Sequence, residues 1–185
     1  MMRRVLFGLA TVAIAALAVY WFALRGSSTT TAEAKPTTPV AQIGEGKTVI
    51  VVGDEGQILG TRTTDSNKKG GGKQQKHLVL LPVKQKPKGD RVKGHVLEEV
   101  HVIAAAPGAI RHYLAAARYG KTGVTLETTT GIEIRFGDDL EAARKWEAAA
   151  TVLADPSVTL LSYVDVTAPT HPAVGGENHE LPPAN

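Results

Sequence analysis

The sequence contains no cysteine, and this absence removes several classes of function at once. A chain without cysteine has no disulfide framework, no thiol nucleophile, no cysteine-ligated zinc site and no lipidated cysteine. Aromatic residues are also scarce, at 5% of 185 residues, and none lies among the clustered basic residues of 68–93. Sites that stack single-stranded nucleic acid interleave aromatic and basic side chains. We therefore expect no nucleic-acid partner.

Catalytic and metal-binding patterns are missing as well. The six histidines include no pair at i,i+4 and no His-Glu-x-x-His motif, so no metal site is predicted. Two Gly-Lys-Thr triplets, at 46–48 and 120–122, lack the first glycine of a phosphate-binding loop and precede no helix. The adjacent Asp138 and Asp139 suit either acid–base chemistry or helix capping, and their place at a predicted helix start favours capping. We expect no enzymatic activity, no cofactor and no small-molecule substrate.

A long apolar run fills residues 5–24 and follows Arg3 and Arg4. Twenty helical residues, at about 1.5 Å each, cross the roughly 30 Å hydrocarbon layer of a membrane. The two arginines favour a cytoplasmic N-terminus. A cleaved signal peptide is the alternative, and Ala32-Glu33-Ala34 offers a small-x-small site. The run is longer than a signal core, so an uncleaved anchor in the inner (plasma) membrane is predicted, in contact with lipid through 5–24.

Residues 25–46 are rich in Ser, Thr, Ala and Pro, and they predict a flexible linker. The net charge of +3 is uneven, because lysines and arginines crowd residues 68–93. Such a basic segment is typical of a solvated loop, and it also suits attraction to an anionic polymer. The residues after Pro172 contain Gly-Gly, Asn and Pro-Pro, so 171–185 are predicted to be a disordered tail.

The most informative stretch, residues 132–169, predicts a strand, a helix and a second strand. Ile132, Ile134 and Phe136 alternate with Glu133 and Arg135, which is typical of a half-buried strand. Asp138 then suits a helix N-cap with a capping-box Glu141, and Glu141 is also expected to pair with Lys145. Apolar residues follow at helical spacing and predict a buried helix face: Leu140, Ala143, Trp146, Ala149 and Leu153. Leu160 to Val166 predicts the second strand.

Further elements are predicted upstream of this stretch. Residues 48–52 and 57–61 predict a hairpin, 78–81 a short buried strand and 92–103 a helix that ends before Pro107-Gly108. Residues 124–129 predict another strand. Residues 110–119 are ambiguous, because Leu114-Ala-Ala-Ala-Arg118 has helical propensity.

Several motifs resemble the C-terminal β-domain of FtsQ/DivIB cell-division proteins. They are Ile-Arg-Phe-Gly-Asp at 134–138, Lys145-Trp146, Val-Leu-Ala-Asp at 152–155 and Tyr-Val-Asp-Val at 163–166, followed by Pro169. The resemblance extends weakly back to Val-Val-Gly-Asp-Glu-Gly-Gln-Ile-Leu at 51–59. It implies that 110–119 form a strand. The family usually carries a POTRA domain before its β-domain, and here only the linker stands in that place.

The sequence thus predicts an α+β fold, in which a single N-terminal transmembrane helix precedes a small mixed or antiparallel β-sheet domain with two packed helices. The predicted parts are a cytoplasmic N-terminus (1–4), a membrane helix (5–24), a linker (25–46), an extracytoplasmic β-domain (47–170) and a tail (171–185). By resemblance, the chain is a non-enzymatic scaffold of the division septum that binds FtsB/FtsL-type partners through the edge of its last strand. The partner-binding residues implied are Leu161, Ser162, Tyr163, Val164, Asp165 and Val166. The competing hypothesis is a module that binds peptidoglycan or an anionic wall polymer through the basic loops 68–93.

Overall fold

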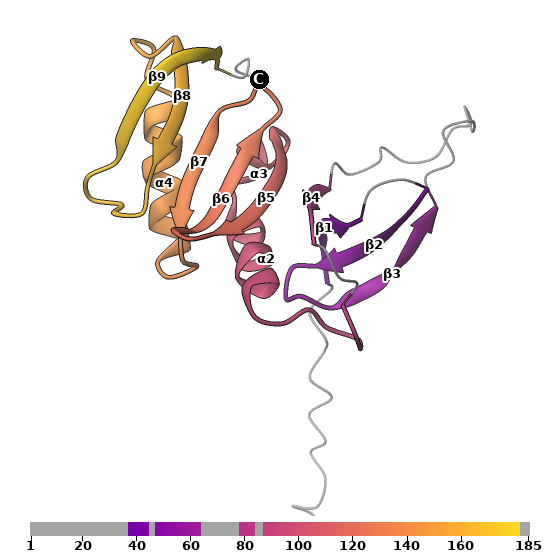
Figure 1. Cartoon of the computed structure of the whole chain (residues 1–185). Helices are drawn as coiled ribbons and strands as arrows, with labels where there is room; N and C mark the ends of the chain where they lie inside the picture. Colours follow the sequence, from indigo (N-terminus) through magenta and orange to yellow (C-terminus); the bar gives the residue numbers. More distant parts are fainter. Residues whose placement is uncertain (1–36, 45–46, 64–77, 84–86, 182–185) are drawn as a thin grey trace, which may run out of the picture. The chain divides into compact units, whose positions relative to one another are not determined.

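The computed structural model describes residues 37–44, 47–63, 78–83 and 87–181, which form strands and three helices (Figure 1). The strands are β1 (Pro39–Ile43), β2 (Thr48–Gly53), β3 (Ile58–Thr63), β4 (Val79–Leu81), β5 (Leu114–Gly120), β6 (Gly123–Thr128), β7 (Glu133–Gly137), β8 (Leu160–Asp165) and β9 (Ala173–Glu180). The helices are α2 (His95–Ala105), α3 (Gly108–Arg111) and α4 (Ala142–Leu153). The predicted membrane segment 5–24 and, in the basic segment, residues 68–77 and 84–86 lie outside the described residues. Within those residues, no helix has the length and apolarity needed to cross a membrane.

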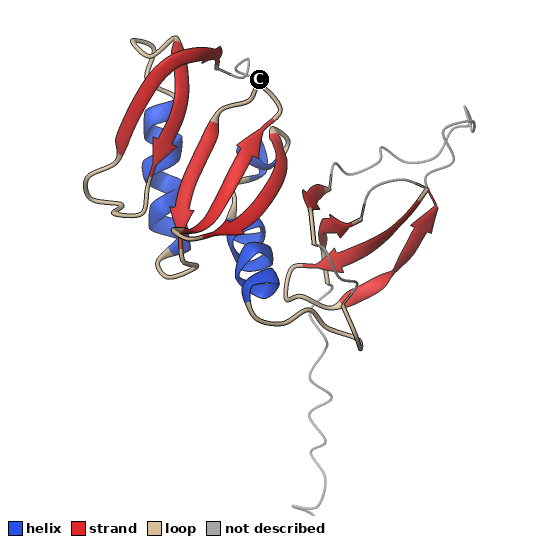
Figure 2. Cartoon of the chain, viewed as in Figure 1, coloured by secondary structure: helices blue, strands red, loops and turns tan. Residues whose placement is uncertain are grey.

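The strands form one mixed sheet in the order β3-β2-β1-β4-β5-β6-β7-β8-β9. Strands joined directly by turns pair antiparallel, as in β2–β3, β5–β6 and β6–β7. The pairs β1–β4, β4–β5 and β7–β8 are parallel. A parallel neighbour requires a crossover connection, and α4 supplies it between β7 and β8. The described part therefore has the mixed α+β architecture that the sequence predicts, with β9 at one end of the sheet (Figure 2).

The long helices pack on the sheet, α2 on β1, β4, β5 and β6 and α4 on β8, and the core lies between the helices and the strands. Inward residues of the strands alternate with half-exposed ones; in β7, Ile134 and Phe136 are fully buried. Trp146 of α4 is 1% exposed, and its ring centroid lies 5.1 Å from that of Phe136. Its indole Nε1 donates a hydrogen bond to the carbonyl oxygen of Val102 in α2, at 2.8 Å. The tryptophan thus joins both long helices to the sheet, as its predicted core position requires.

The start of α4 differs from the predicted capping box. The helix begins at Ala142, and Glu141 precedes it with a left-handed φ of 51°. Asp138 instead accepts a hydrogen bond from the backbone N–H of Leu140 at 3.1 Å, which makes a local turn before the helix. Consequently Leu140 is 68% exposed, and its predicted place on the buried face is wrong. Ala143 is exposed as well, whereas Trp146 and Ala149 are buried as predicted.

The ion pairs of this helix also differ from the prediction. Glu141 pairs with Arg144 at 2.7 Å, one turn along the exposed surface. Lys145 is buried, with a side chain only 5% exposed, and its Nζ lies 2.6 Å from Asp138 Oδ1. The predicted Glu141–Lys145 pair is therefore wrong, because each side chain pairs with another residue, Glu141 with Arg144 and Lys145 with Asp138.

Two segments predicted to lack structure are strands. Part of the predicted linker forms β1, in which Val40, Ala41 and Ile43 are buried between β2 and β4. The predicted tail 171–185 contains β9, which pairs antiparallel with β8. The strand expected at 110–119 is confirmed from Leu114 onward, while Gly108–Arg111 form the short helix α3. The predicted hairpin and the strands at 78–81 and 124–129 are confirmed.

Candidate partner-binding end of the sheet

Strand β8, which was predicted to present a free edge, is paired on both sides. Its parallel partner is β7, with Tyr163 opposite Glu133 and Val164 opposite Ile134. Its antiparallel partner is β9, with Val164 opposite Val174 and Leu160 opposite Glu180. The premise that β8 is the outermost strand is therefore wrong, because the glycine-containing segment after Pro172 continues the sheet (Figure 1).

The six predicted partner-binding residues divide between the two faces of β8 and the residue after it. Leu161, Val164 and Val166 are 3%, 0% and 0% exposed, and they belong to the core. Ser162, Tyr163 and Asp165 are half-buried. The pairing with β9 is irregular between Leu161 and Tyr163, where four residues of β9 lie opposite two of β8. Half of the predicted set therefore stabilises the fold and is unavailable to a partner in the folded state.

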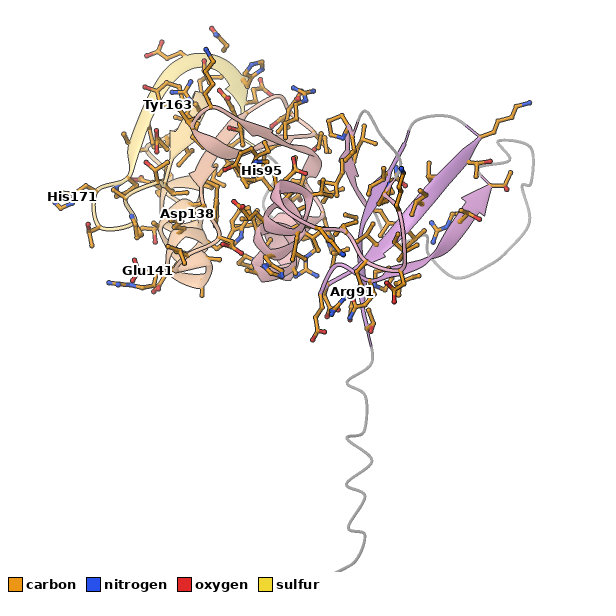
Figure 3. The ribbon with its side chains drawn as sticks, turned by 60° about the horizontal axis from the view of Figure 1, so that its bottom comes forward. Arg91, His95, Asp138, Glu141, Tyr163 and His171 are labelled. Atoms are coloured by element: carbon orange, nitrogen blue, oxygen red, sulfur yellow. The ribbon has the colours of Figure 1, made fainter. Side chains whose placement is uncertain are left out.

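Tyr163 is half-buried and has close neighbours on both adjacent strands (Figure 3 labels the residue). The guanidinium carbon of Arg135, on β7, lies 3.8 Å from the centroid of the tyrosine ring, a cation–π arrangement. On the other side, Gly175 of β9 approaches so closely that a Cβ there would lie 2.7 Å from the tyrosine Oη. Only glycine fits beside the ring, so Tyr163 packs against the backbone of β9.

Ser162, the residue before it, leaves a buried hydroxyl without a partner. Its Oγ has no hydrogen-bond partner among the described residues. Gly176 lies directly over it in a left-handed conformation (φ 71°), and a Cβ on Gly176 would overlap that oxygen. An unsatisfied buried hydroxyl costs free energy, typically about 1–3 kcal/mol. The contact between β8 and β9 is therefore imperfect at its centre.

Strand β9 has few side-chain anchors. None of its eight residues is buried; Gly175 and His179 are half-buried, and Val174 is 46% exposed. His179 packs against Gly131, in the β6–β7 turn, where a Cβ would lie 2.9 Å from the imidazole. Leu181, just after the strand, packs against the core. Backbone pairing with β8 therefore carries most of the attachment, and the outer edge of β9 is unpaired among the described residues.

A polar cluster beside the β7–α4 loop contains the residues considered for acid–base chemistry. Lys145 Nζ donates one hydrogen bond to the carboxylate of Asp138 and another to its backbone carbonyl oxygen. The bond to the carboxylate holds the pKa of Asp138 below its usual value. His101 Nδ1 lies 2.7 Å from Asp139 Oδ2 and connects α2 to the same loop (Figure 3 marks Asp138). These contacts fix the loop. Within the described residues, no group of side chains has the arrangement of a metal site, and the absence of enzymatic activity stays a prediction.

The described part of the basic segment lines a hollow of about 380 Å³. Val92 and Val96 contribute apolar walls, and Lys88, Arg91 and Lys93 contribute positive charge. Arg91 also lies 3.5 Å from Glu55 Oε2 and donates to the carbonyl oxygen of Glu55. The glutamate therefore offsets part of the positive charge. Residues 64–77 and 84–86, with the other lysines, lie outside the described residues.

No family model matches the chain, and no curated protein matches it. Among solved structures, the chain is similar to the major extracytoplasmic domain of the trans isomer of the bacterial cell division protein DivIB from Geobacillus stearothermophilus. The two chains are 14% identical, with a TM-score of 0.37, and the match covers 67% of this chain and 92% of that chain.

Sequence reasoning missed the strand that matters most here. Residues Ala173–Glu180 contain one large apolar side chain, Val174, so no period-2 pattern marks them. The signal that was present is local: Gly175 and Gly176 follow a tyrosine-containing strand, and glycine in a strand often marks close approach of another backbone. The structure shows such an approach at both glycines.

Proposed function

We propose that the chain is a non-enzymatic, membrane-anchored scaffold that binds an extended partner segment at the β8–β9 end of its sheet. The observation that carries the proposal is the outer edge of β9, which is unpaired in the described part of the chain. An end strand presents backbone N–H and C=O groups that a partner strand can complete. Val174, Glu177 and Asn178 of this strand are exposed, so apolar and polar side chains are both available to a partner.

The opposite end of the sheet suits this role less well. There, β3 is partly covered by the segment before α2, because Ile58 N–H donates to the carbonyl oxygen of Asp90 at 2.7 Å. Gln57 and Arg91 form a bridge beside this contact. A partner strand at β3 would meet this segment, whereas among the described residues no segment covers β9.

The partner class follows from the motifs at 134–138 and 163–166, which resemble FtsQ/DivIB proteins. On that basis, the partners are small FtsB/FtsL-type division proteins, and the site of action is the division septum. The binding end of the sheet is formed by the last two strands of the chain, β8 and β9, which pair with each other. Tyr163 then contributes indirectly by holding Gly175 of β9.

Site-specific photocrosslinking in living cells tests this function. A photoreactive amino acid replaces Val174 or Glu177 on β9, and Leu59 on β3 or Leu140 before α4 as exposed controls. We expect crosslinks from both β9 positions to an identified division protein, and none to it from the controls. Crosslinks from all four positions alike, or from β9 only to proteins outside the division machinery, would contradict the proposal.

The membrane anchor is a separate part of the proposal, motivated by the apolar run 5–24 after Arg3 and Arg4. Protease added to spheroplasts is expected to digest the chain beyond residue 26 while the anchor stays with the membrane. Protection of the C-terminal part would place it in the cytoplasm. A mature N-terminus near Lys35 would instead identify a cleaved signal peptide.

A second candidate function is supported by the hollow lined by Lys88, Arg91 and Lys93. In this alternative the basic segment binds an anionic polymer of the cell envelope. Ionic strength separates the two candidates, because exposed charges are screened within about 10 Å at 0.1 M salt. Binding through the hollow is expected to weaken steeply with added salt, whereas backbone pairing at β9 is expected to change little.

A further inference from the structure

We propose that β9 is an exchangeable strand, which an extended segment of a partner protein displaces from β8. This inference rests on the proposed function and specifies how the partner is held. The partner then pairs with β8 itself and takes the position that β9 occupies in the free protein. The alternative, in which a partner adds outside an undisturbed β9, is an outcome that the experiment below distinguishes.

The attachment of β9 suits exchange, because most of it can be reproduced by another strand. No side chain of β9 is buried, so displacement removes none of its side chains from the core. The backbone pairs between Leu160 and Glu180 and between Asp165 and Ala173 are available to any antiparallel strand. The main exception is Leu181, which packs against the core just beyond the strand.

The centre of the contact favours a better-fitting replacement. Ser162 Oγ is buried without a hydrogen-bond partner under Gly176, and Gly176 holds a positive φ there. An incoming strand without this irregularity could supply a donor or acceptor to the hydroxyl. Exchange would then satisfy a group that the free protein leaves unsatisfied.

The position beside β8 that β9 occupies also defines the chemistry of a partner strand that replaces β9. It takes an extended segment of about the eight residues that β9 has. The position that faces Tyr163 favours glycine, because a Cβ in the place of Gly175 would lie 2.7 Å from the tyrosine Oη. At the far end, a flat ring in the place of His179 fits against Gly131. A partner strand that keeps the irregularity of β9 therefore carries a glycine followed four residues later by an aromatic or histidine side chain. A partner strand with regular pairing carries these two residues only two positions apart, opposite Tyr163 and Leu161.

A disulfide lock separates exchange from addition. Leu160 and Glu180 are register partners, both exposed, so cysteines at these two positions lie within reach of a disulfide. The chain has no other cysteine, so the lock is unique. The probe is a fluorescein-labelled synthetic peptide with the sequence of residues 172–182, and the full chain is the receptor. The single variant Leu160→Cys is the matched control.

We expect the peptide to bind the unlocked chain, to be excluded from the oxidised Leu160→Cys/Glu180→Cys variant, and to bind again after reduction. Leu181→Ala is expected to tighten binding about tenfold, because the native strand loses its apolar anchor. A chain that ends at Pro172 is expected to bind most tightly. Oxidation of the single-cysteine control is expected to change nothing.

Equal binding to the oxidised and reduced variants would show addition outside β9, which overturns exchange and leaves the proposed function intact. Failure of the peptide to bind any form, including the folded chain that ends at Pro172, would overturn exchange, whereas the proposed function fails only if crosslinking from β9 captures no division protein. Disulfide-linked dimers of the double variant would show that a second copy, rather than a partner protein, supplies the strand, and would also overturn the proposal.

Discussion

Replacing Trp146 with alanine is expected to lower the free energy of unfolding by about 3–5 kcal/mol, the usual cost of removing a buried tryptophan. The ring is 1% exposed, packs against Phe136 and donates a hydrogen bond to Val102 in α2. Its loss leaves a cavity between α2, α4 and the sheet, and an unpaired carbonyl group in the core. For a domain of this size, such a loss is a large share of total stability.

Two variants control this result, and denaturant unfolding followed by circular dichroism measures all three. Trp146→Phe keeps most of the apolar volume, so a smaller loss of about 1–3 kcal/mol is expected, from the hydrogen bond and the smaller ring. Leu140→Ala, at a residue 68% exposed, is expected to change stability by less than about 0.5 kcal/mol. If Trp146→Ala matched Leu140→Ala in stability yet lost partner binding, the tryptophan would be an interface residue.

The free energy of unfolding is expected to fall as pH rises from 5 to 8, because of Glu99 in α2. The side chain is 4% exposed, and burial raises its pKa to about 7. The hydrogen bond with the backbone of Tyr119 lowers this pKa, and the negative charge of the nearby Glu98 raises it. The unfolded carboxyl titrates near 4.5. Between these values the folded state binds more protons than the unfolded state, so stability is highest at low pH and is lost as pH rises through 7.

Each pKa unit corresponds to about 1.4 kcal/mol, so the loss is on the order of 3 kcal/mol. Glu99→Gln is expected to flatten the profile and to be more stable than the parent at pH 8. Glu147→Gln, at an exposed glutamate of α4, is the matched control and is expected to keep the slope. The lowered pKa of Asp138 acts in the opposite direction only near and below its usual value of 3.8, outside this window. An unchanged slope in Glu99→Gln would contradict the assignment.

The parts of the fold that could be predicted are those in which side chains carry the signal. In β7 the alternation of Ile134 and Phe136 with polar residues reflects burial on one face, and the structure confirms it. The helical spacing of apolar residues likewise predicts that Trp146 and Ala149 are buried, and the structure confirms both. The start of α4 could not be predicted, because the turn at Asp138 and the left-handed Glu141 compete with a capping box that the sequence also allows.

The end strands depend on backbone pairing, which leaves little trace in a sequence. Strand β1 is five residues long, and its apolar residues fill a space between β2 and β4 that only the assembled sheet creates. Strand β9 has no buried side chain, so composition indicated a disordered tail. The candidate site was therefore predicted one strand too early, at Leu161–Val166, although Tyr163 and Ser162 do form the surface on which β9 rests.

Amide hydrogen exchange of the full chain, alone and with the division protein identified by crosslinking, tests the central claim most directly. Backbone pairing at the β8–β9 end predicts slower exchange upon binding in residues 160–180, with no change in β3. Slower exchange confined to residues 83–96, around the basic hollow, with 160–180 unchanged, would contradict it.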